Sequence, residues 1–376
     1  MAIGTCKVYS EQSVAANNGD LVQWSGRTVS GDQGGVSFDW LGVTARVAVQ
    51  GASYVTTTVT STAPNRGTRL KAYTSDQNFL LYPEVQFWVK PTTVSSQYDL
   101  WLGKNSSETR VITVENIVAP QYQTGVTTVH SFQTDGTFVP LSLDQRLGGP
   151  QARRIEFIGD SITAATNVVR PAGAPPCGDG GYQSDWSQTY EGLLCHHFNA
   201  DCSTVAVGGK CVMHECGGLQ MPDYFPSILY ANAPNRTYDF SHWAPDAMFI
   251  DLGTNDMRAI TKLKEKGMGR FAEETVAFMV NATRLYSKAD IQFFLSAGPM
   301  ENSTMPGTLA AIRQATKQGL KATFVDMRAA CASSRLHAPD DSDHCDGCAG
   351  HPGVEGHRGM YEAAWPVLSR VMGWGA

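Results

Sequence analysis

The chain has 376 residues, of which 42% are hydrophobic and 17% charged, and its formal net charge is −6. This length suggests two domains, and the apolar content excludes a disordered chain. No basic run indicates a nucleic-acid partner, and no apolar stretch approaches the ~18 residues of a membrane span. We therefore expect a globular protein without a nucleic-acid partner, a membrane span or an obligate protein partner.

Residues 1–148 are predicted to form strands. Val43, Ala45, Val47 and Val49 alternate with other residues at a period of two, which places them on one face of a strand. Threonine-rich runs separated by Gly, Asn, Asp and Ser clusters are typical of short strands joined by turns. The pattern predicts an all-β domain over residues 1–148, a jelly-roll-like sandwich of antiparallel sheets.

Residues 149–376 alternate short apolar strands with amphipathic helices, which predicts an α/β domain with a parallel sheet and helices on both faces. The expected strands are 154–158, 203–207, 247–252, 292–295 and 323–325. The Pro- and Gly-rich segment 166–187 is predicted to be a loop, and a loop of this length inside a compact domain is usually functional.

Three candidate site residues follow expected strands. Ser161, in the sequence GDSIT, comes directly after the first strand, at the sheet edge where α/β proteins bind ligands. Ser161 can act as a nucleophile there, or it can simply cap a helix. Gly209 and Asn255 follow the next two strands, and each alone is compatible with an ordinary turn. Together, the N–H groups of Ser161 and Gly209 and the Asn255 amide can supply three donors to an oxyanion.

A candidate base lies near the end of the chain. His351 comes just before the last expected helix, where it can reach across to Ser161, although a loop histidine can also only cap or pack. Trp186 follows the long loop and is a candidate for stacking on a sugar ring or, alternatively, for packing against the sheet.

The order of these segments resembles the SGNH (GDSL-type) hydrolase superfamily. The matching blocks are GDSIT at 159–163, a glycine pair at 208–209, GTND at 253–256 and HP at 351–352. The resemblance covers essentially residues 154–376 and implies a flavodoxin-like, three-layer domain without a cofactor. It further implies Ser161 as the nucleophile, His351 as the base, and Gly209 and Asn255 as oxyanion donors beside the Ser161 N–H.

Further segments resemble the family-2 carbohydrate esterases, in which a β-sandwich domain precedes the hydrolase domain. These segments are 190–194, 206–210, 297–300 and 346–352, with weaker similarity at 38–49 and 132–140. The resemblance implies removal of O-acetyl groups from sugar hydroxyls, with an acetylated polysaccharide or oligosaccharide as the partner. A general short-chain carboxylesterase or lipase, and a catalytically silent glycan-binding protein, remain as alternatives.

The third member of the catalytic group is open. Most superfamily members have an Asp three residues before the base histidine, but this chain has Cys348 there. Asp346 is the nearest carboxylate, and segment 341–344 repeats the Asp-x-x-His spacing further from the last helix. The site is therefore either a Ser-His dyad whose histidine is held by a backbone carbonyl, or a triad completed by Asp346.

Nine cysteines and four N-x-Ser/Thr sequons point to an oxidising compartment. Disulfides are favoured over a zinc site built from the same cysteines and neighbouring histidines, so no metal is expected. The expected pairs are Cys195–Cys202, Cys211–Cys216 and pairing among Cys177, Cys331, Cys345 and Cys348. The first 13 residues have no basic or apolar region of a signal peptide, so we expect the mature form of a secreted, extracellular protein.

Overall fold

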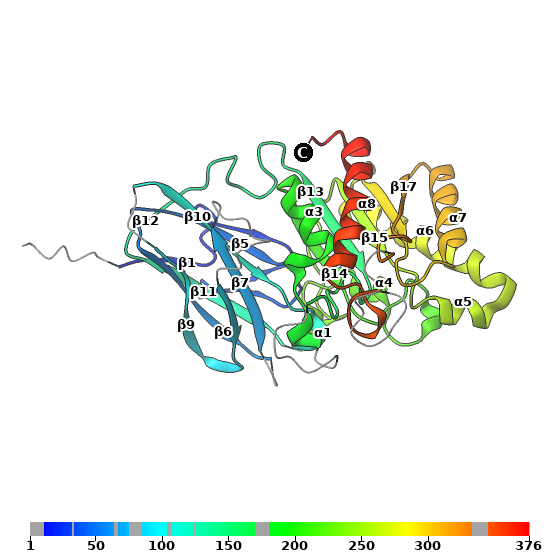
Figure 1. Cartoon of the computed structure of the whole chain (residues 1–376). Helices are drawn as coiled ribbons and strands as arrows, with labels where there is room; N and C mark the ends of the chain where they lie inside the picture. The colour runs from blue at the N-terminus through cyan, green and yellow to red at the C-terminus, as the bar shows by residue number, and fades with distance from the viewer. Residues whose placement is uncertain are drawn as a thin grey trace, which may run out of the picture.

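The computed structural model describes residues 11–375 except 32–33, 64–66, 75–84, 104–106, 124, 170–176, 178–179 and 333–344. Antiparallel strands occupy one end of the molecule, and the parallel sheet with most of the helices occupies the other (Figure 1). The expected change from strands to alternating strands and helices along the chain is confirmed. In the described ranges, no helix has the length and apolar character needed to cross a membrane.

The first part of the chain forms two antiparallel sheets. One has the order β3-β4-β11-β6-β9 with β1 paired to β11, and the other has the order β12-β5-β10-β7-β8 with β2 paired to β5. The strands are β1 (Gln12–Ala15), β2 (Val22–Ser25), β3 (Val29–Ser30), β4 (Val36–Phe38), β5 (Thr44–Gln50), β6 (Tyr54–Ser61), β7 (Thr68–Thr74), β8 (Val85–Val89), β9 (Thr92–Leu102), β10 (Thr109–Asn116), β11 (Thr127–Thr134) and β12 (Thr137–Val139).

The alternation predicted for the first part places its core. Ala45, Val47 and Val49 of β5 are at most 2% exposed and belong to the cluster that both antiparallel sheets share. Arg46, between them, points the other way and donates to Asn199 Oδ1 over 3.1 Å. A short helix, α1 (Pro120–Gln123), interrupts the strands, and its four residues are too few to produce a helical period in the sequence.

The second part contains a five-stranded parallel sheet with the order β14-β13-β15-β16-β17. Its strands are β13 (Arg154–Gly159), β14 (Asp201–Ala206), β15 (Ala247–Asp251), β16 (Gln292–Ala297) and β17 (Lys321–Asp326). The helices are α2 (Gly180–Gln183), α3 (Tyr190–Phe198), α4 (Met221–Tyr224), α5 (Met257–Leu263), α6 (Gly267–Tyr286), α7 (Met305–Lys317) and α8 (Val354–Met372). The segment expected to be one long loop, 166–187, contains α2 and the start of a 3-10 turn.

Helices cover both faces of the parallel sheet. Along β15, Ala247 and Phe249 belong to one apolar cluster with residues of α3 and α8. Met248 and Ile250 belong to the other cluster, with residues of α6 and α7. Successive side chains of a strand point to opposite faces, so the near-continuous apolar sequence of this strand follows from burial on both sides.

Buried polar contacts join the two parts of the chain. Arg27, which follows β2, forms a 2.9 Å ion pair with Glu156 of β13, and both side chains are 0% exposed. Arg27 also donates to the carbonyl groups of Phe225 and Ser227. Glu156 in turn accepts a 2.7 Å hydrogen bond from the Tyr286 hydroxyl. The two charges are therefore buried together, with each held by further hydrogen bonds.

A second set of contacts reinforces this interface. The Asp39 carboxylate accepts the N–H groups of Tyr230 and Ala231 over 2.8 and 2.7 Å. Burial raises the pKa of Asp39 to about 6. Ser25 Oγ donates to the Cys202 carbonyl over 2.7 Å and accepts the Cys202 N–H over 2.9 Å. These hydrogen bonds fix the position of the antiparallel part of the chain relative to the parallel-sheet part.

Replacing Arg27 tests the importance of this interface. Arg27→Met leaves Glu156 buried without its cation, and we expect the free energy of unfolding to fall by about 3–5 kcal/mol. Urea denaturation measures this change. The matched control is Arg328→Met, whose partner Asp326 forms an exposed ion pair with side chains 40% and 47% accessible. The control should cost less than about 1 kcal/mol, and equal losses in the two variants would contradict the assignment.

Candidate active site

Ser161 lies at the carboxyl end of β13, between the ends of β14 and β15. Residues 161–167 form successive turns, closed by bonds such as that from the Thr166 N–H to the Ser161 carbonyl over 3.1 Å. Gly159 is required before the turn, because a Cβ there would lie 2.0 Å from Thr163 Oγ1. The turn leaves the Ser161 side chain half-buried at the sheet edge.

The structure brings His351 to Ser161. Nε2 of His351 lies 2.9 Å from Ser161 Oγ, and Nδ1 lies 3.2 Å from the carbonyl oxygen of Cys348. A carbonyl oxygen can only accept, so Nδ1 must carry the proton in this contact, which leaves Nε2 of a neutral ring free to accept from the serine. This tautomer is the one in which a histidine can deprotonate a serine.

The loop before His351 is tied to the turn after Ser161. Asn167 Nδ2 donates to the Cys348 carbonyl over 3.0 Å, so this one oxygen accepts from both Asn167 and His351. A disulfide joins Cys348 to Cys177. The turn that positions Ser161 and the loop that positions His351 are therefore directly connected to each other.

The disulfides match the pairs expected from the sequence. Cys195–Cys202 and Cys211–Cys216 are confirmed. The other four described cysteines pair as Cys177–Cys348 and Cys331–Cys345. Cys6 and segment 341–344, the alternative Asp-x-x-His motif, lie outside the described residues.

Asp346 lies at the start of α8. Its Oδ1 accepts the N–H groups of Gly353 and Gly356 over 2.9 and 3.0 Å, and its Oδ2 accepts that of Glu355 over 3.1 Å. These are N–H groups that a helix start leaves without intrahelical partners. The structure thus brings Asp346 to the helix that follows His351 rather than to the imidazole ring.

The glycine pair after β14 lies beside Ser161. A Cβ on Gly208 would be 3.7 Å from the Cβ of Ser161, so this backbone approaches the serine closely. Gly209 has a φ of +76°, which favours glycine, and open space surrounds the position that its Cβ would occupy. Its peptide is therefore exposed beside the sheet edge.

Asn255 also lies at this edge, where it is held by Asp160, the residue directly before Ser161. Its Nδ2 donates to Asp160 Oδ2 over 3.0 Å and to the Lys210 carbonyl over 3.2 Å. Both amide hydrogens therefore have acceptors. Asp160 also accepts the Ile162 N–H over 3.0 Å, and burial with the nearby Asp251 charge raises its pKa well above the usual range. Our sequence reasoning missed Asp160 as a positioning residue, although GDSIT contains it.

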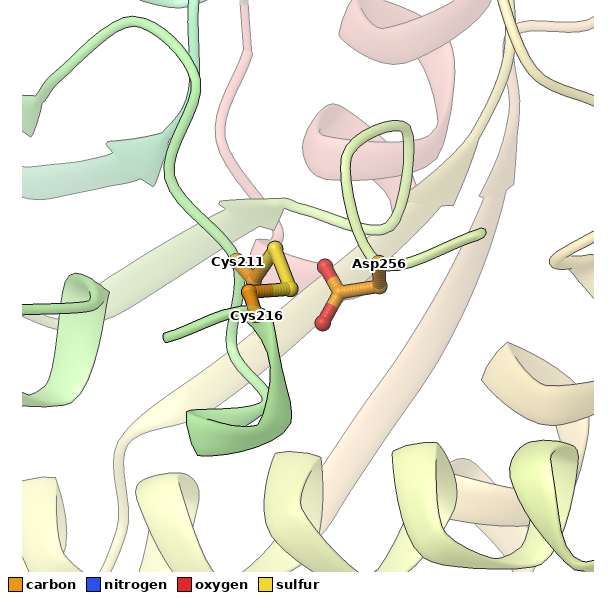
Figure 2. A group of neighbouring side chains, drawn as sticks. All are labelled: Cys211, Cys216 and Asp256. Carbon is orange, nitrogen blue, oxygen red and sulfur yellow. A yellow bond between two sulfur atoms is a disulfide. The ribbon is translucent and has the colours of Figure 1, made fainter. Parts of the chain in front are cut away.

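Asp256 holds the segment that follows the glycine pair in place through hydrogen bonds. Its carboxylate accepts the N–H groups of Val212 and Met213 over 3.3 and 2.9 Å. It faces the Cys211–Cys216 disulfide, and potential ligand atoms of the three residues lie within 4.8 Å of one another (Figure 2). A metal would require thiolates, and the two sulfurs are instead bonded to each other. The group is therefore a support for the loop.

His357 is a second histidine near Ser161 and, unlike the half-buried His351, it is fully buried. It is 0% exposed, stacks on Tyr190, and accepts the Tyr190 N–H at Nδ1 over 3.3 Å. Burial and the neighbouring His351 lower its pKa to about 3. His357 is therefore neutral at ordinary pH and packs in the core.

Trp186 lies in the interface between the two parts of the chain. It is 2% exposed, and a Cβ on Gly42 would lie 2.6 Å from its ring. Its backbone N–H donates to the Ile117 carbonyl over 3.2 Å. The ring presents no face to solvent, so we assign Trp186 no contact with a sugar.

Asp256 should give the stability a measurable pH dependence. Burial raises its pKa from 3.8 to about 7, so the folded state holds a proton that the unfolded state has lost. The contribution is fully present below pH ~3.8 and is lost as the pH rises through ~7, with a slope of up to about 1.4 kcal/mol per pH unit.

Asp256→Asn keeps an acceptor oxygen for one of the two N–H groups and removes the titrating carboxyl, so we expect it to flatten this decline between pH 4 and 7. Chemical denaturation at several pH values measures the slope. Asp144→Asn, at an exposed position, is the control and should leave the slope as in the wild type. A wild-type slope in Asp256→Asn would contradict the assignment.

Comparison with known proteins identifies the family. The model of the GDSL-like lipase/acylhydrolase family matches residues 157–358. This match covers more than half of the chain and includes Ser161, Gly209, Asn255 and His351. The chain belongs to the GDSL-like lipase/acylhydrolase family, as the sequence resemblance implied.

Two curated relatives match over part of their length. The chain is 29% identical over 197 residues to the "Acetylxylan esterase / glucomannan deacetylase" of Cellvibrio japonicus, a match covering 50% of this chain and 52% of that protein. It is 26% identical over 237 residues to the "Cellulase/esterase CelE" of Acetivibrio thermocellus, covering 60% of this chain and 26% of that protein. The matches thus span about half or less of these relatives.

Solved structures share the fold over nearly the whole chain. A family two carbohydrate esterase from Cellvibrio japonicus aligns with a TM-score of 0.75 and 18% identity, covering 97% of this chain and 99% of that one. The acetyl xylan esterase Est2A from Butyrivibrio proteoclasticus aligns with a TM-score of 0.79 and 16% identity, covering 98% and 99%. Both the antiparallel sheets and the parallel sheet therefore belong to a known arrangement.

Proposed function

We propose that this protein is a serine esterase that removes O-acetyl groups from sugar hydroxyls of polysaccharides. The observation that supports it most directly is the 2.9 Å contact between Ser161 Oγ and His351 Nε2, with Nδ1 directed at the Cys348 carbonyl. The substrate class rests on relatives, which are named acetylxylan esterase, glucomannan deacetylase and carbohydrate esterase. One neighbour was solved with cellohexaose bound.

In the proposed reaction, His351 takes the Ser161 proton while Oγ attacks the ester carbonyl. The tetrahedral intermediate collapses to an acetyl-enzyme when His351 protonates the leaving sugar hydroxyl. Water, deprotonated by the same histidine, then attacks the acetyl carbonyl; the bond from Ser161 Oγ to the acetyl carbon breaks as His351 returns the proton to Oγ, and acetate is released. The Cys348 carbonyl stabilises the imidazolium that forms twice in this cycle, and Asp346 acts indirectly by holding the start of α8.

The oxyanion would be stabilised by the N–H groups of Ser161 and Gly209 and by the Asn255 amide. Both Asn255 amide hydrogens already have acceptors. One of these two hydrogen bonds must therefore break so that the amide can donate to the oxyanion as it forms. The 3.2 Å bond to the Lys210 carbonyl is the longer of the two, and we propose that this bond is exchanged. Asp160 would keep the amide in place during the exchange.

The remaining parts of the proposal concern architecture and location. The parallel strand order corresponds to the 2-1-3-4-5 order of flavodoxin-like folds, which we propose for a hydrolase domain over residues 149–376. We propose that residues 1–148 form a jelly-roll-like sandwich domain. Four disulfides in the described residues favour an extracellular location.

A series of p-nitrophenyl esters from acetyl to octanoyl tests the function. We expect the wild type to hydrolyse the acetyl ester fastest, and Ser161→Ala to abolish the rate because no nucleophile remains. Comparable rates on long acyl chains would instead favour a general carboxylesterase or lipase. A chain that binds glycan but shows no Ser161-dependent rate on any ester would be a silent binding protein and would overturn the proposal.

Asn255→Ala tests the oxyanion assignment. Loss of one donor should lower kcat by about 10²–10³, with a smaller change in KM because the interaction forms in the transition state. Steady-state kinetics on an acetyl ester measure both constants. Asn232→Ala, at an exposed position, is the control and should keep the wild-type kcat. An unchanged kcat in Asn255→Ala would remove this residue from the site.

A further inference from the structure

A segment of the antiparallel part of the chain enters the core beneath the nucleophile. Ile117, Val118 and Ala119 follow β10 and are at most 1% exposed. They belong to the same apolar cluster as Ile162 and Ala164, which lie in the turn after Ser161. The segment therefore cannot shift without disturbing the packing under the catalytic turn.

The short helix α1 continues from this segment and is held at its far end. Gln123 is 1% exposed, and its Nε2 donates to the carbonyl groups of Asp39 and Val118 over 2.8 Å each. Asp39 in turn accepts two N–H groups from the parallel-sheet part of the chain. The helix is thus fixed to both parts of the molecule.

Gln121, inside this helix, points its amide at the catalytic edge of the parallel sheet. A Cβ on Gly208 would lie 3.0 Å from Gln121 Nε2 and 3.7 Å from the Cβ of Ser161. The Gln121 amide, the Gly208 backbone and the nucleophile therefore meet around one point. A residue larger than glycine at 208 would compete with the amide for this space.

Among the residues that the structure describes, the Gln121 amide has no hydrogen-bond partner. Both Nε2 and Oε1 are shielded from solvent and unpaired in the structure, although the residue as a whole is only half-buried. Buried amides are nearly always paired, so an unpaired one beside a nucleophile is a candidate for bonding a ligand. Since both polar atoms are shielded, a ligand at Ser161 would reach the amide only after rotation of the Gln121 side chain.

We propose that Gln121 is a specificity-determining residue, which hydrogen-bonds a free sugar hydroxyl next to the acetylated position; this inference rests on the proposed function. A hydroxyl both donates and accepts, as the amide does, so the two groups can satisfy each other. An acyl chain or a nitrophenyl ring offers no such donor. The sandwich part of the chain thereby takes part in choosing a carbohydrate ester over other acetyl esters.

The test compares two substrates in wild type and Gln121→Leu, which keeps much of the volume but removes both the donor and the acceptor of the amide. We expect kcat/KM on acetylated xylobiose to fall about 10-fold, the loss of one neutral hydrogen bond, while p-nitrophenyl acetate stays within about 2-fold. Gln12→Leu, at an exposed position of β1, is the matched control. Gln121→Glu, which keeps the acceptor but loses the donor, is a second variant should Gln121→Leu fail to fold.

The outcomes separate this inference from the proposed function. Equal losses on both substrates would mean that Gln121 acts only through the Gly208 backbone, and no loss on either would remove it from the site; both results overturn the inference. A wild type without any Ser161-dependent rate would overturn the proposed function and this inference together. A changed ratio between the two substrates in Gln121→Leu or Gln121→Glu, with the control at the wild-type ratio, supports the inference.

Discussion

The buried ion pair between Arg27 and Glu156 holds the antiparallel part of the chain against the parallel sheet. Glu156 lies on β13, the strand that ends just before Ser161, so this contact between the two parts of the chain also holds the strand that leads to Ser161. Two charges taken out of water are tolerated only when each is well paired, and here carbonyl and hydroxyl groups complete the pairing. The antiparallel part is consequently a structural component of the site region.

The parallel sheet explains why residues distant in sequence meet. Parallel strands end at the same edge, so the segments after β13, β14 and β15 lie side by side. Ser161, Gly209 and Asn255 each occupy one of these segments. Asp160, directly before Ser161, adds a local link, because its carboxylate accepts a hydrogen bond from the Asn255 amide. The sheet supplies the approximate position and the hydrogen bonds supply the orientation.

A backbone carbonyl and a disulfide hold the loop before His351. The Cys348 carbonyl accepts from His351 and from Asn167, while the Cys177–Cys348 disulfide ties down the same residue. A carbonyl oxygen can only accept a hydrogen bond, so this contact favours the tautomer of the neutral imidazole that carries its proton on Nδ1. Asp346 contributes indirectly, because its carboxylate accepts N–H groups at the start of α8.

The sequence by itself indicated antiparallel strands followed by a parallel sheet with helices, the family, and the candidates Ser161 and His351, because strand periodicity and short motifs are local properties. It could not decide where Asp346 and Trp186 lie, since a carboxylate five residues from a histidine can bond the ring or the next helix equally well. Gln121 had no signal at all: it lies on a four-residue helix in the other part of the chain. Its place beside Gly208 depends on how the antiparallel sheets pack against the parallel-sheet part of the chain, and only the tertiary structure decides that.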